Sequence, residues 1–421
     1  MMPTNFRVIA TLLALVLINA ACATAADTSP PTDVPPTLAG EPATIEVVAA
    51  AEDEATAVPL TSPLPTPALL PAEEPPPGAA REFSTDFTRH TIPYSEIFSG
   101  GPPKDGIPAI DNPSFIAVPE ADEWLGDLEP VIVFQEQAET RIYPFQILTW
   151  HEIVNDVVGG RLVFVTFCPL CNTAIVFDAT VNGQALTFGT TGRLRFSNLL
   201  MYDRQTESWW QQAGGDAVIG ELAGSQLTFL PATIISWAEA QAMFPEAQVL
   251  SRDTGHSRRY GQNPYVGYDD INSSPFLFQG DTPDQLPPMT RVTTVALADE
   301  AVAYPNETLA QVGVVNDEVG DTAVVVIWQP GLASALDSSS IAEGQDVGAS
   351  GVFDRSLNGQ TLTFVQEGDS IVDEQTGSVW NIFGQAIAGE LAGQSLTPLV
   401  KVDHFWFSWA AFRPDTRIYQ P

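Results

Sequence analysis

The strongest secondary-structure signal in the chain is the segment 162–177, which reads LVFVTFCPLCNTAIVF. Its two halves are short apolar runs rich in β-branched and aromatic residues, a pattern typical of buried strands. A Cys-Pro-Leu-Cys sequence separates the two runs. The segment therefore predicts two neighbouring strands joined by a short turn that carries two thiols.

Further strands are expected downstream of this segment. Strand patterns lie at 185–188, 199–202 and 227–230, and Asn182-Gly183 is a strong signal for a hairpin turn. The sequence therefore predicts that each folded unit consists mostly of strands.

Two short helices are also expected. The first is indicated by four residues that share one helical face: Ile147, Trp150, His151 and Val154. The second begins at Ser236, which can cap a helix together with Glu239, and ends at Pro245. Strands and short helices together predict a β-rich α+β fold.

The chain contains this pattern twice. Asn182-Gly183-Gln184 returns as Asn358-Gly359-Gln360, and the sequence Gly-Glu-Leu-Ala-Gly at 220–224 returns at 389–393. Tandem copies of this length indicate two similar modules and not a solenoid of small units. The expected boundaries are a signal segment at 1–26, a Pro/Ala/Thr-rich disordered linker at 27–82, a first module at 83–273 and a degenerate second module at 274–421.

Only the first copy carries the sulfur and imidazole groups that could do chemistry. The copies align at an offset of 161 residues, as in the pair Tyr143 and Tyr304. Four residues are lost in the second copy: His151 pairs with Val312, Cys168 with Gln329, Cys171 with Leu332 and, after a gap of six residues, Met201 with Ile371. We therefore expect the chemistry in the first module and a structural partner in the second, which buries a face of the first.

The composition excludes some classes of function. The net charge of −35, from 52 acidic and 17 basic side chains, argues against nucleic-acid partners, because such binding depends on clustered Lys and Arg. No Gly-rich phosphate loop, His-Glu-x-x-His motif or Gly-x-Ser-x-Gly motif occurs, so neither a nucleotide cofactor nor a hydrolase of a familiar type is expected. Whether the protein is an enzyme stays open.

The N-terminus resembles an export signal. Arg7 precedes an apolar run at 8–18, which is too short to span a bilayer, and small residues follow. Cys22 resembles the lipid-modified cysteine of a bacterial lipoprotein, although Asn19 departs from that pattern. The linker at 27–82 has almost no aromatic residues and would hold a domain away from a membrane. We expect an extracytoplasmic lipoprotein anchored to the cell membrane, or alternatively a secreted protein.

The spacing of Cys168 and Cys171 suits three chemistries. The pair can be a metal knuckle, a redox dithiol, or a structural disulfide or buried thiol pair. Covalent haem is disfavoured because Asn172 stands where the axial histidine would follow the second cysteine. A thioredoxin-type site is disfavoured because residues 173–177 predict a strand and not a long helix.

Two further residues are candidate ligands. A tetrahedral zinc site needs four ligands, and His151 and Met201 are absent from the second copy together with the cysteines. A set of two cysteines, one histidine and one methionine is soft, which favours Cu(I), with zinc as the second choice. The alternative is a metal-free redox or structural dithiol in a protein that acts through surface contacts.

Other polar residues are assigned by the same comparison. Residues 192–198 lie in a stretch that the second copy lacks, so Arg195 and Ser197 are candidate pocket residues for an anion or substrate; an ordinary surface loop is the alternative. The segment 256–260, His-Ser-Arg-Arg-Tyr, concentrates positive charge in an acidic chain. The residues that persist in both copies are assigned structural roles: Asn155, Asp156, Asp203, Gln205 and Thr206.

Four motifs together resemble a known family. They are KDGIPAIDNP at 104–113, WHEIVND at 150–156, CPLC at 168–171 and LMYDRQTES at 200–208. They are similar to an exported bacterial and archaeal family known as domain of unknown function 3179 (DUF3179). The resemblance covers roughly 105–268 and implies an exported protein, frequently a lipoprotein, without an established activity. Asn172, where the family typically has glycine, and the degenerate second copy are departures from it.

Overall fold

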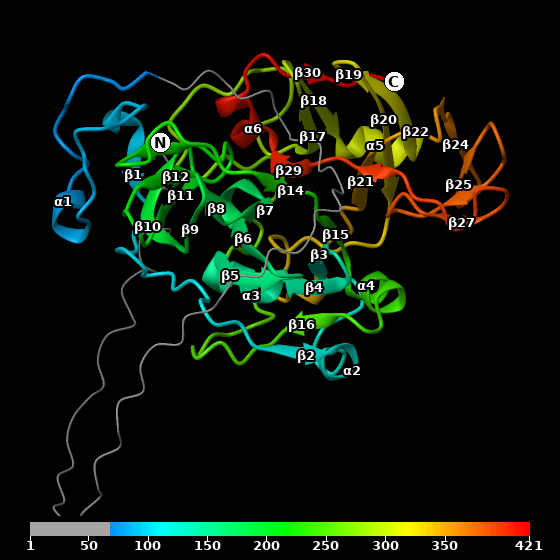
Figure 1. Cartoon of the computed structure of the whole chain (residues 1–421), viewed down its shortest axis with the longest axis horizontal. Helices are drawn as coiled ribbons and strands as arrows, with labels where there is room; N and C mark the ends of the chain where they lie inside the picture. Colours follow the sequence, from blue (N-terminus) through cyan, green and yellow to red (C-terminus); the bar gives the residue numbers. More distant parts are fainter. Residues whose placement is uncertain (1–67) are drawn as a thin grey trace, which may run out of the picture. The chain divides into compact units, whose positions relative to one another are not determined.

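The computed structural model describes residues 68–421, in which strands predominate and helices are short (Figure 1). The predicted signal segment, Cys22 and most of the predicted linker lie outside this range. The folded part begins before Phe83, the expected start, because Leu70 N–H donates to His90 O at 2.8 Å and a helical turn covers Ala79–Glu82. Within the described residues no helix is long and apolar enough to cross a membrane.

The first module consists of short elements in the following order: α1 (Ala79–Glu82), η1 (Tyr94–Glu96), β1 (Ile97–Ser99), β2 (Phe115–Ala117), α2 (Val118–Ala121), β3 (Pro130–Glu136), β4 (Glu139–Pro144), α3 (Phe145–His151), β5 (Ile153–Val158), β6 (Arg161–Cys168), η2 (Pro169–Cys171), β7 (Thr173–Asp178), β8 (Thr180–Val181), β9 (Gln184–Ala185), β10 (Phe188–Arg195), β11 (Asn198–Asp203), β12 (Trp209–Gln211), β13 (Ala217–Ile219), β14 (Phe229–Leu230), β15 (Thr233–Ser236), α4 (Trp237–Met243) and β16 (Gln248–Leu250).

The second module repeats most of these elements: β17 (Arg291–Leu297), β18 (Glu300–Pro305), α5 (Asn306–Val312), β19 (Val314–Val319), β20 (Thr322–Gln329), η3 (Ile341–Glu343), β21 (Ala349–Asp354), β22 (Ser356–Leu357), β23 (Gln360–Thr361), β24 (Phe364–Glu367), β25 (Ser370–Asp373), β26 (Val379–Trp380), β27 (Ala386–Ala388), β28 (Thr397–Pro398), β29 (Lys401–Phe405), α6 (Trp406–Phe412) and β30 (Arg417–Ile418).

Each module has a two-stranded sheet, β8-β9 or β22-β23, and three larger sheets with the same strand order in both modules. The sheet β15-β3-β4-β16 corresponds to β29-β17-β18-β30, the sheet β14-β7-β6-β5 to β28-β21-β20-β19, and the sheet β10-β11-β12-β13 to β24-β25-β26-β27. The first module adds β2 at the edge of one sheet and β1 at the edge of another. The prediction of two tandem related modules in a β-rich α+β fold is therefore confirmed.

The polar residues retained in both copies make the same hydrogen bonds in each. Trp210 Nε1–H donates to Asp203 Oδ2 at 2.9 Å, and Trp380 Nε1–H donates to Asp373 Oδ2 at 2.9 Å. Two other pairs match in the same way: Tyr143 with Asp156 at 2.7 Å and Tyr304 with Asp317 at 2.8 Å. Buried polar groups need hydrogen-bond partners, so these residues stabilise the fold that the two modules share. They are not specific to the module that carries the cysteines.

The two predicted strands around the cysteines are confirmed as β6 and β7, and Ser236 caps α4 by accepting from Glu239 N–H. The first helix is shorter than predicted. It ends at His151, and Val154, the fourth member of the predicted helical face, lies in β5. All six residues of β5, four of which are β-branched, pair with residues 161–166 of β6, and this pairing outweighs the helical spacing.

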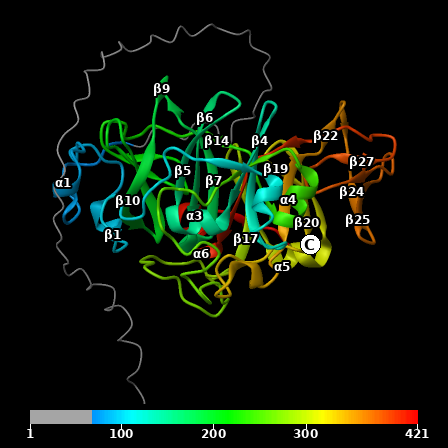
Figure 2. The same ribbon diagram turned by 90° about the horizontal axis from the view of Figure 1, so that it is seen from below.

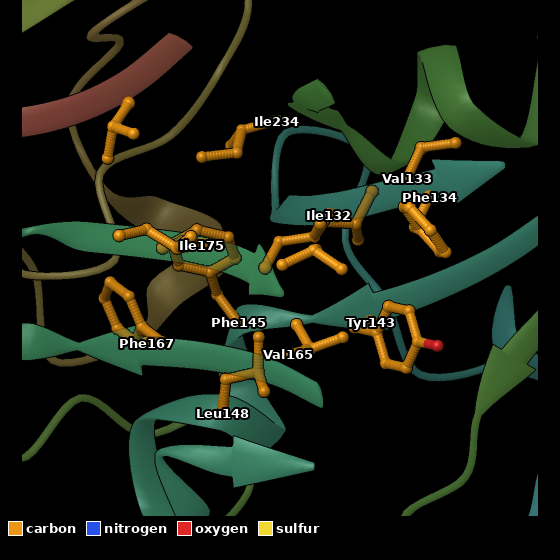
Figure 3. Close-up of a cluster of buried hydrophobic side chains, with 14 of the residues drawn as sticks. Ile132, Val133, Phe134, Tyr143, Phe145, Leu148, Val165, Phe167, Ile175 and Ile234 are labelled. Carbon is orange, nitrogen blue, oxygen red and sulfur yellow. The ribbon is translucent and has the colours of Figure 1, made fainter. Parts of the chain in front are cut away.

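The core of the first module lies where the sheet of β3 and β4 meets the sheet of β6 and β7 (Figure 3). Figure 3 shows side chains from β3, β4, α3, β6, β7 and β15 converging: Ile132, Val133, Phe134, Tyr143, Phe145, Leu148, Val165, Phe167, Ile175 and Ile234. Most of them are fully buried. The strand β6 is therefore anchored along its length up to the cysteines at its end.

The modules contact each other reciprocally. Strand β15 of the first module lies beside β21 of the second, and β29 of the second, the counterpart of β15, lies beside β7, the counterpart of β21 (Figure 1). Figure 2 shows the yellow and orange strands of the second module beside the green strands of the first. The core cluster that contains both cysteines also contains side chains of the second module: Val325, Ile327, Leu332, Ala335, Leu336, Phe405 and Phe407. The second module thus packs against the face of the first that carries the cysteine turn.

Candidate functional site

The cysteine turn joins the ends of β6 and β7. Cys168 ends β6 opposite Thr173, and η2 brings Cys171 back toward it. Both cysteines are free thiols, and they are 2% and 0% exposed. Asn172 has φ 52° and ψ 40°, the left-handed conformation that glycine and asparagine adopt most easily. Asparagine at position 172 therefore suits the turn.

The hairpin β10–β11 covers the two thiols. Its two-residue tip, Phe196 and Ser197, has φ values of 50° and 65°, as in a type I′ turn. The thiols of Cys168 and Cys171 both point to the backbone oxygen of Ser197, at 3.8 and 3.4 Å. The two sulfur atoms therefore converge on one carbonyl group.

This hairpin tip is the part that the second copy has lost. The hairpin spans 188–203 in the first module and only 364–373 in the second. The six missing residues are the end of the hairpin that reaches the thiols. The stretch 192–198, which the sequence marks as a candidate pocket segment, therefore contacts the thiols through the Ser197 carbonyl.

A buried carboxyl group lies near the thiols. Glu152 follows α3 at φ 58°, and its counterpart Gly313 follows α5 at φ 70°. This conformation costs an L-residue about 1–2 kcal/mol, and glycine relieves it. Burial raises the pKa of Glu152 to about 8, so the carboxyl group is largely protonated at neutral pH. The first module therefore keeps a strained, buried acid where the second has the residue that suits the backbone.

The thiol of Cys168 has a high pKa. Burial raises it well above the usual range, the neighbouring Cys171 thiol and Glu152 raise it further, and the Leu199 backbone N–H opposes them. Burial, Cys171 and Glu152 therefore all disfavour a negative charge on the sulfur atom of Cys168. Cys168 is therefore held as a neutral thiol unless a cation or a proton acceptor takes part.

His151 is hydrogen-bonded at both ring nitrogens. Nδ1 lies 2.7 Å from Pro108 O, which requires a proton on Nδ1, and Nε2 accepts from the hydroxyl of Tyr260 at 2.7 Å. Burial lowers the pKa of His151 to about 4, with His256 and Arg258 adding to the effect. As long as these bonds persist, neither nitrogen has a lone pair to offer to a metal ion.

The structure brings only part of the predicted ligand set together. Cys168 and Cys171 meet, whereas His151 is bonded elsewhere. Met201 is fully buried in β11 opposite Thr190 and Trp210, in the same core cluster as the cysteines. Within residues 68–421 no three His, Cys, Asp or Glu side chains are grouped so that they could hold a metal ion.

The predicted pocket residues have intramolecular partners. Arg195 Nε–H donates to Glu96 Oε2 at 2.7 Å, and its guanidinium group lies 4.8 Å from the ring centre of Phe196. The Ser197 hydroxyl donates to Phe276 O at 2.6 Å. An external anion would have to compete with Glu96 for Arg195, and Ser197 turns its carbonyl, not its hydroxyl, to the cysteines.

The second module closes the site from the other side. The hydroxyl of Thr173, which donates to Cys171 O at 3.1 Å, lies 2.8 Å from Nδ1 of His404 in β29. Burial lowers the pKa of His404 to about 3, so its imidazole is neutral. The hydroxyl of Tyr268 donates to Leu170 O at 2.9 Å within the cysteine turn. Tyr268 N–H in turn donates to Leu336 O at 3.1 Å.

The structure corrects the predicted counterpart of Cys171. Gln329, at the end of β20, pairs directly with Ala349 in β21, just as Cys168 pairs with Thr173. A loop at 330–348 therefore replaces the short cysteine turn, and Leu332 lies inside that loop. The pairing of Cys171 with Leu332 was wrong because a constant offset cannot cross an insertion. The loss of both thiols from the second copy is unaffected.

Sequence reasoning missed three residues near the thiols. Glu152 was detectable, because the alignment of the copies places it opposite Gly313 and a glutamate is unusual where a helix ends in glycine. Tyr268 and His404 lie far from the cysteines in the sequence, so only the tertiary structure could reveal them.

The comparisons with known proteins place the chain in a family. The family model described as "Protein of unknown function (DUF3179)" matches residues 104–416. The match includes the second module, so the expectations that the resemblance ends near Tyr268 and that the second copy departs from the family were wrong. No curated protein and no solved structure gives a match. With well over half of its length matched, the chain belongs to the DUF3179 family of proteins of unknown function.

Proposed function

We propose that the first module binds one soft metal ion through Cys168 and Cys171, with Cu(I) preferred over zinc. The observation that carries the proposal is the convergence of both buried thiols on the Ser197 carbonyl. This contact depends on a hairpin tip that is absent from the second module, where the cysteines are absent too. The turn and the hairpin tip that covers it were thus retained or lost together.

The ligand chemistry favours copper. Thiolates are soft ligands that select Cu(I), whereas a structural zinc site needs four ligands. Two thiolates are sufficient for Cu(I), which accepts linear coordination. Binding would displace the proton of each thiol, and the positive ion would offset the cost of burying negative charge at Cys168. His151 would join only by giving up its bond to Tyr260.

A second candidate is a metal-free redox dithiol, and the position of Glu152 favours it. In this version Cys168 attacks a disulfide of a partner, which forms a mixed disulfide and releases one thiol of the partner. Cys171 then attacks the sulfur of Cys168, so that the Cys168–Cys171 disulfide forms and the second thiol of the partner is released. Two electrons pass to the partner, and the two protons of the pair pass to its sulfur atoms. Glu152, in its ionised form, would take the proton of Cys168 and return it to the leaving thiol.

Elemental analysis of anaerobically purified protein distinguishes these candidates. The first predicts copper or zinc in the wild type and none in Cys168→Ser/Cys171→Ser, with His151→Gln as the matched control that retains the metal. Equal metal contents in the wild type and the double serine variant would refute it. Thiol titration in denaturant without reductant then tests the second candidate, which predicts a quantitatively oxidised pair in the native protein; two free thiols after metal removal would exclude a disulfide.

We also propose that the protein is exported and held at the membrane by lipid on Cys22. The support is the sequence alone: a basic start, a short apolar run, and a long Pro-rich linker behind the cysteine. Diacylation would bring two acyl chains, and at about 0.8 kcal/mol per buried methylene two chains anchor a protein where one does not. Secretion without an anchor is the alternative.

A further inference from the structure

A hollow on the first module is lined by two adjacent arginines and by no acidic residue. It has a volume of about 470 Å³ and is lined by Trp150, Ser257, Arg258, Arg259, Gln262, Asn263 and Pro264. No aspartate or glutamate lines it, although the chain has 52 acidic and only 17 basic side chains. A donor-rich, cationic hollow is therefore exceptional in this protein.

The donors of the hollow have unused capacity. Arg258 and Arg259 are exposed, and within residues 68–421 neither forms a salt bridge, whereas Lys104 and Arg195 elsewhere are paired with Glu207 and Glu96. The indole N–H of Trp150 is buried and has no acceptor among the described residues. A guanidinium group and an indole N–H can only donate, so the missing component is an acceptor.

The hollow is built on ordered structure. Trp150 belongs to α3, and Asn263 is 5% exposed and bonds to the second module, where Ser338 O accepts from its side chain at 3.0 Å. Tyr260, which follows the two arginines, is held by His151 and by Thr254. The arginines therefore project from a segment fixed at both ends.

We propose that this hollow binds a small organic anion through its phosphate, sulfate or carboxylate head. Guanidinium groups match such heads with two parallel hydrogen bonds each, and the hollow has two of these groups, on Arg258 and Arg259. The volume lies within the range of small-molecule sites, about 300–1,000 Å³, and is larger than a single inorganic ion requires. The remainder of the ligand would lie along the ring of Trp150.

The site is separate from the cysteines and does not depend on a metal. No residue of the cysteine turn lines it, and the basic segment that does line it approaches His151, whose ring centre is 5.4 Å from that of His256. Binding of an anion here should therefore be unchanged in Cys168→Ser/Cys171→Ser, so failure of the metal proposal would leave this one intact.

Calorimetric titration of the full mature chain with inorganic phosphate at low ionic strength tests the proposal. We expect saturable binding that weakens at least about tenfold in Arg258→Ala/Arg259→Ala, because each charge-assisted hydrogen bond contributes enough for a factor of this size. The control Arg81→Ala/Arg89→Ala removes the same charge from two exposed arginines outside the hollow and should bind as the wild type does.

The absence of saturable binding by the wild type would overturn the proposal. Equal weakening in the two double-arginine variants would also overturn it, because it would assign the effect to overall charge.

Discussion

Replacing Glu152 with glycine should make the protein more stable, and the gain should grow as the pH rises. Glu152 has φ 58° at the end of α3, where its counterpart Gly313 has φ 70°. Relief of the left-handed conformation should contribute about 1 kcal/mol at any pH. Most core substitutions destabilise a protein, so a gain at a buried site would be diagnostic.

The pH dependence follows from the pKa of the same carboxyl group. Burial raises this pKa from 4.5 to about 8. The folded protein therefore holds a proton that the unfolded chain releases, and the stability that this proton contributes is fully present below pH 4.5 and is lost as the pH rises through 8. At about 1.4 kcal/mol per pKa unit, the loss is on the order of 4 kcal/mol over this range.

Guanidinium denaturation followed by circular dichroism at pH 5, 7 and 8, under reducing conditions, measures both effects. Glu152→Gly should exceed the wild type at each pH, with the largest difference at pH 8. Glu152→Gln keeps the strained backbone and cannot ionise, so it should lack the loss of stability that ionisation of Glu152 causes in the wild type between pH 5 and 8; the buried histidines His151 and His404 contribute equally to both proteins. The exposed Glu246→Gln is the control and should follow the wild type. If Glu152→Gly is less stable than the wild type, or both have the same pH dependence, the reasoning fails.

Three further predictions concern the modules and the location. Deletion of 274–421 should expose the shared core and cause aggregation, as measured by light scattering; a stable monomer with the full-length melting temperature would contradict this. Gln329→Cys/Leu332→Cys should not create a metal site, because the two positions lie at the end of β20 and inside a long loop; a second equivalent of copper by elemental analysis would contradict this. Cys22→Ala should move the protein from the membrane to the soluble exported fraction of cells; equal distribution of both forms would show that the chain is secreted.

The sequence carried enough information for the sheets and for the repeat. Strands β6 and β7 are apolar runs separated by a turn, so their local sequence pattern predicts them. Turn residues such as Asn182-Gly183 recur in both copies, so the repeat supports the same strand boundaries. The end of α3 could not be placed as well, because Val154 fits both a helical face and a strand. Pairing with β6, a tertiary effect, decides between them.

The candidate site was only half predictable, for physical reasons. The comparison of the copies marks the cysteines, since loss of a chemical group is visible in the sequence. It cannot show that both nitrogens of His151 are already hydrogen-bonded, because their partners Pro108 and Tyr260 lie far away in the chain. It names Ser197 as an anion or substrate contact, whereas the structure turns the carbonyl of Ser197 to the thiols and its hydroxyl to Phe276 O.

Titration of metal-free, reduced protein with Cu(I) against a chromophoric chelator tests whether the thiol pair is a metal site. We predict that the wild type withdraws one equivalent of Cu(I) from the chelator, that His151→Gln does the same, and that Cys168→Ser/Cys171→Ser withdraws none. Withdrawal of copper by the double serine variant, or none by the wild type, would contradict the proposed metal site.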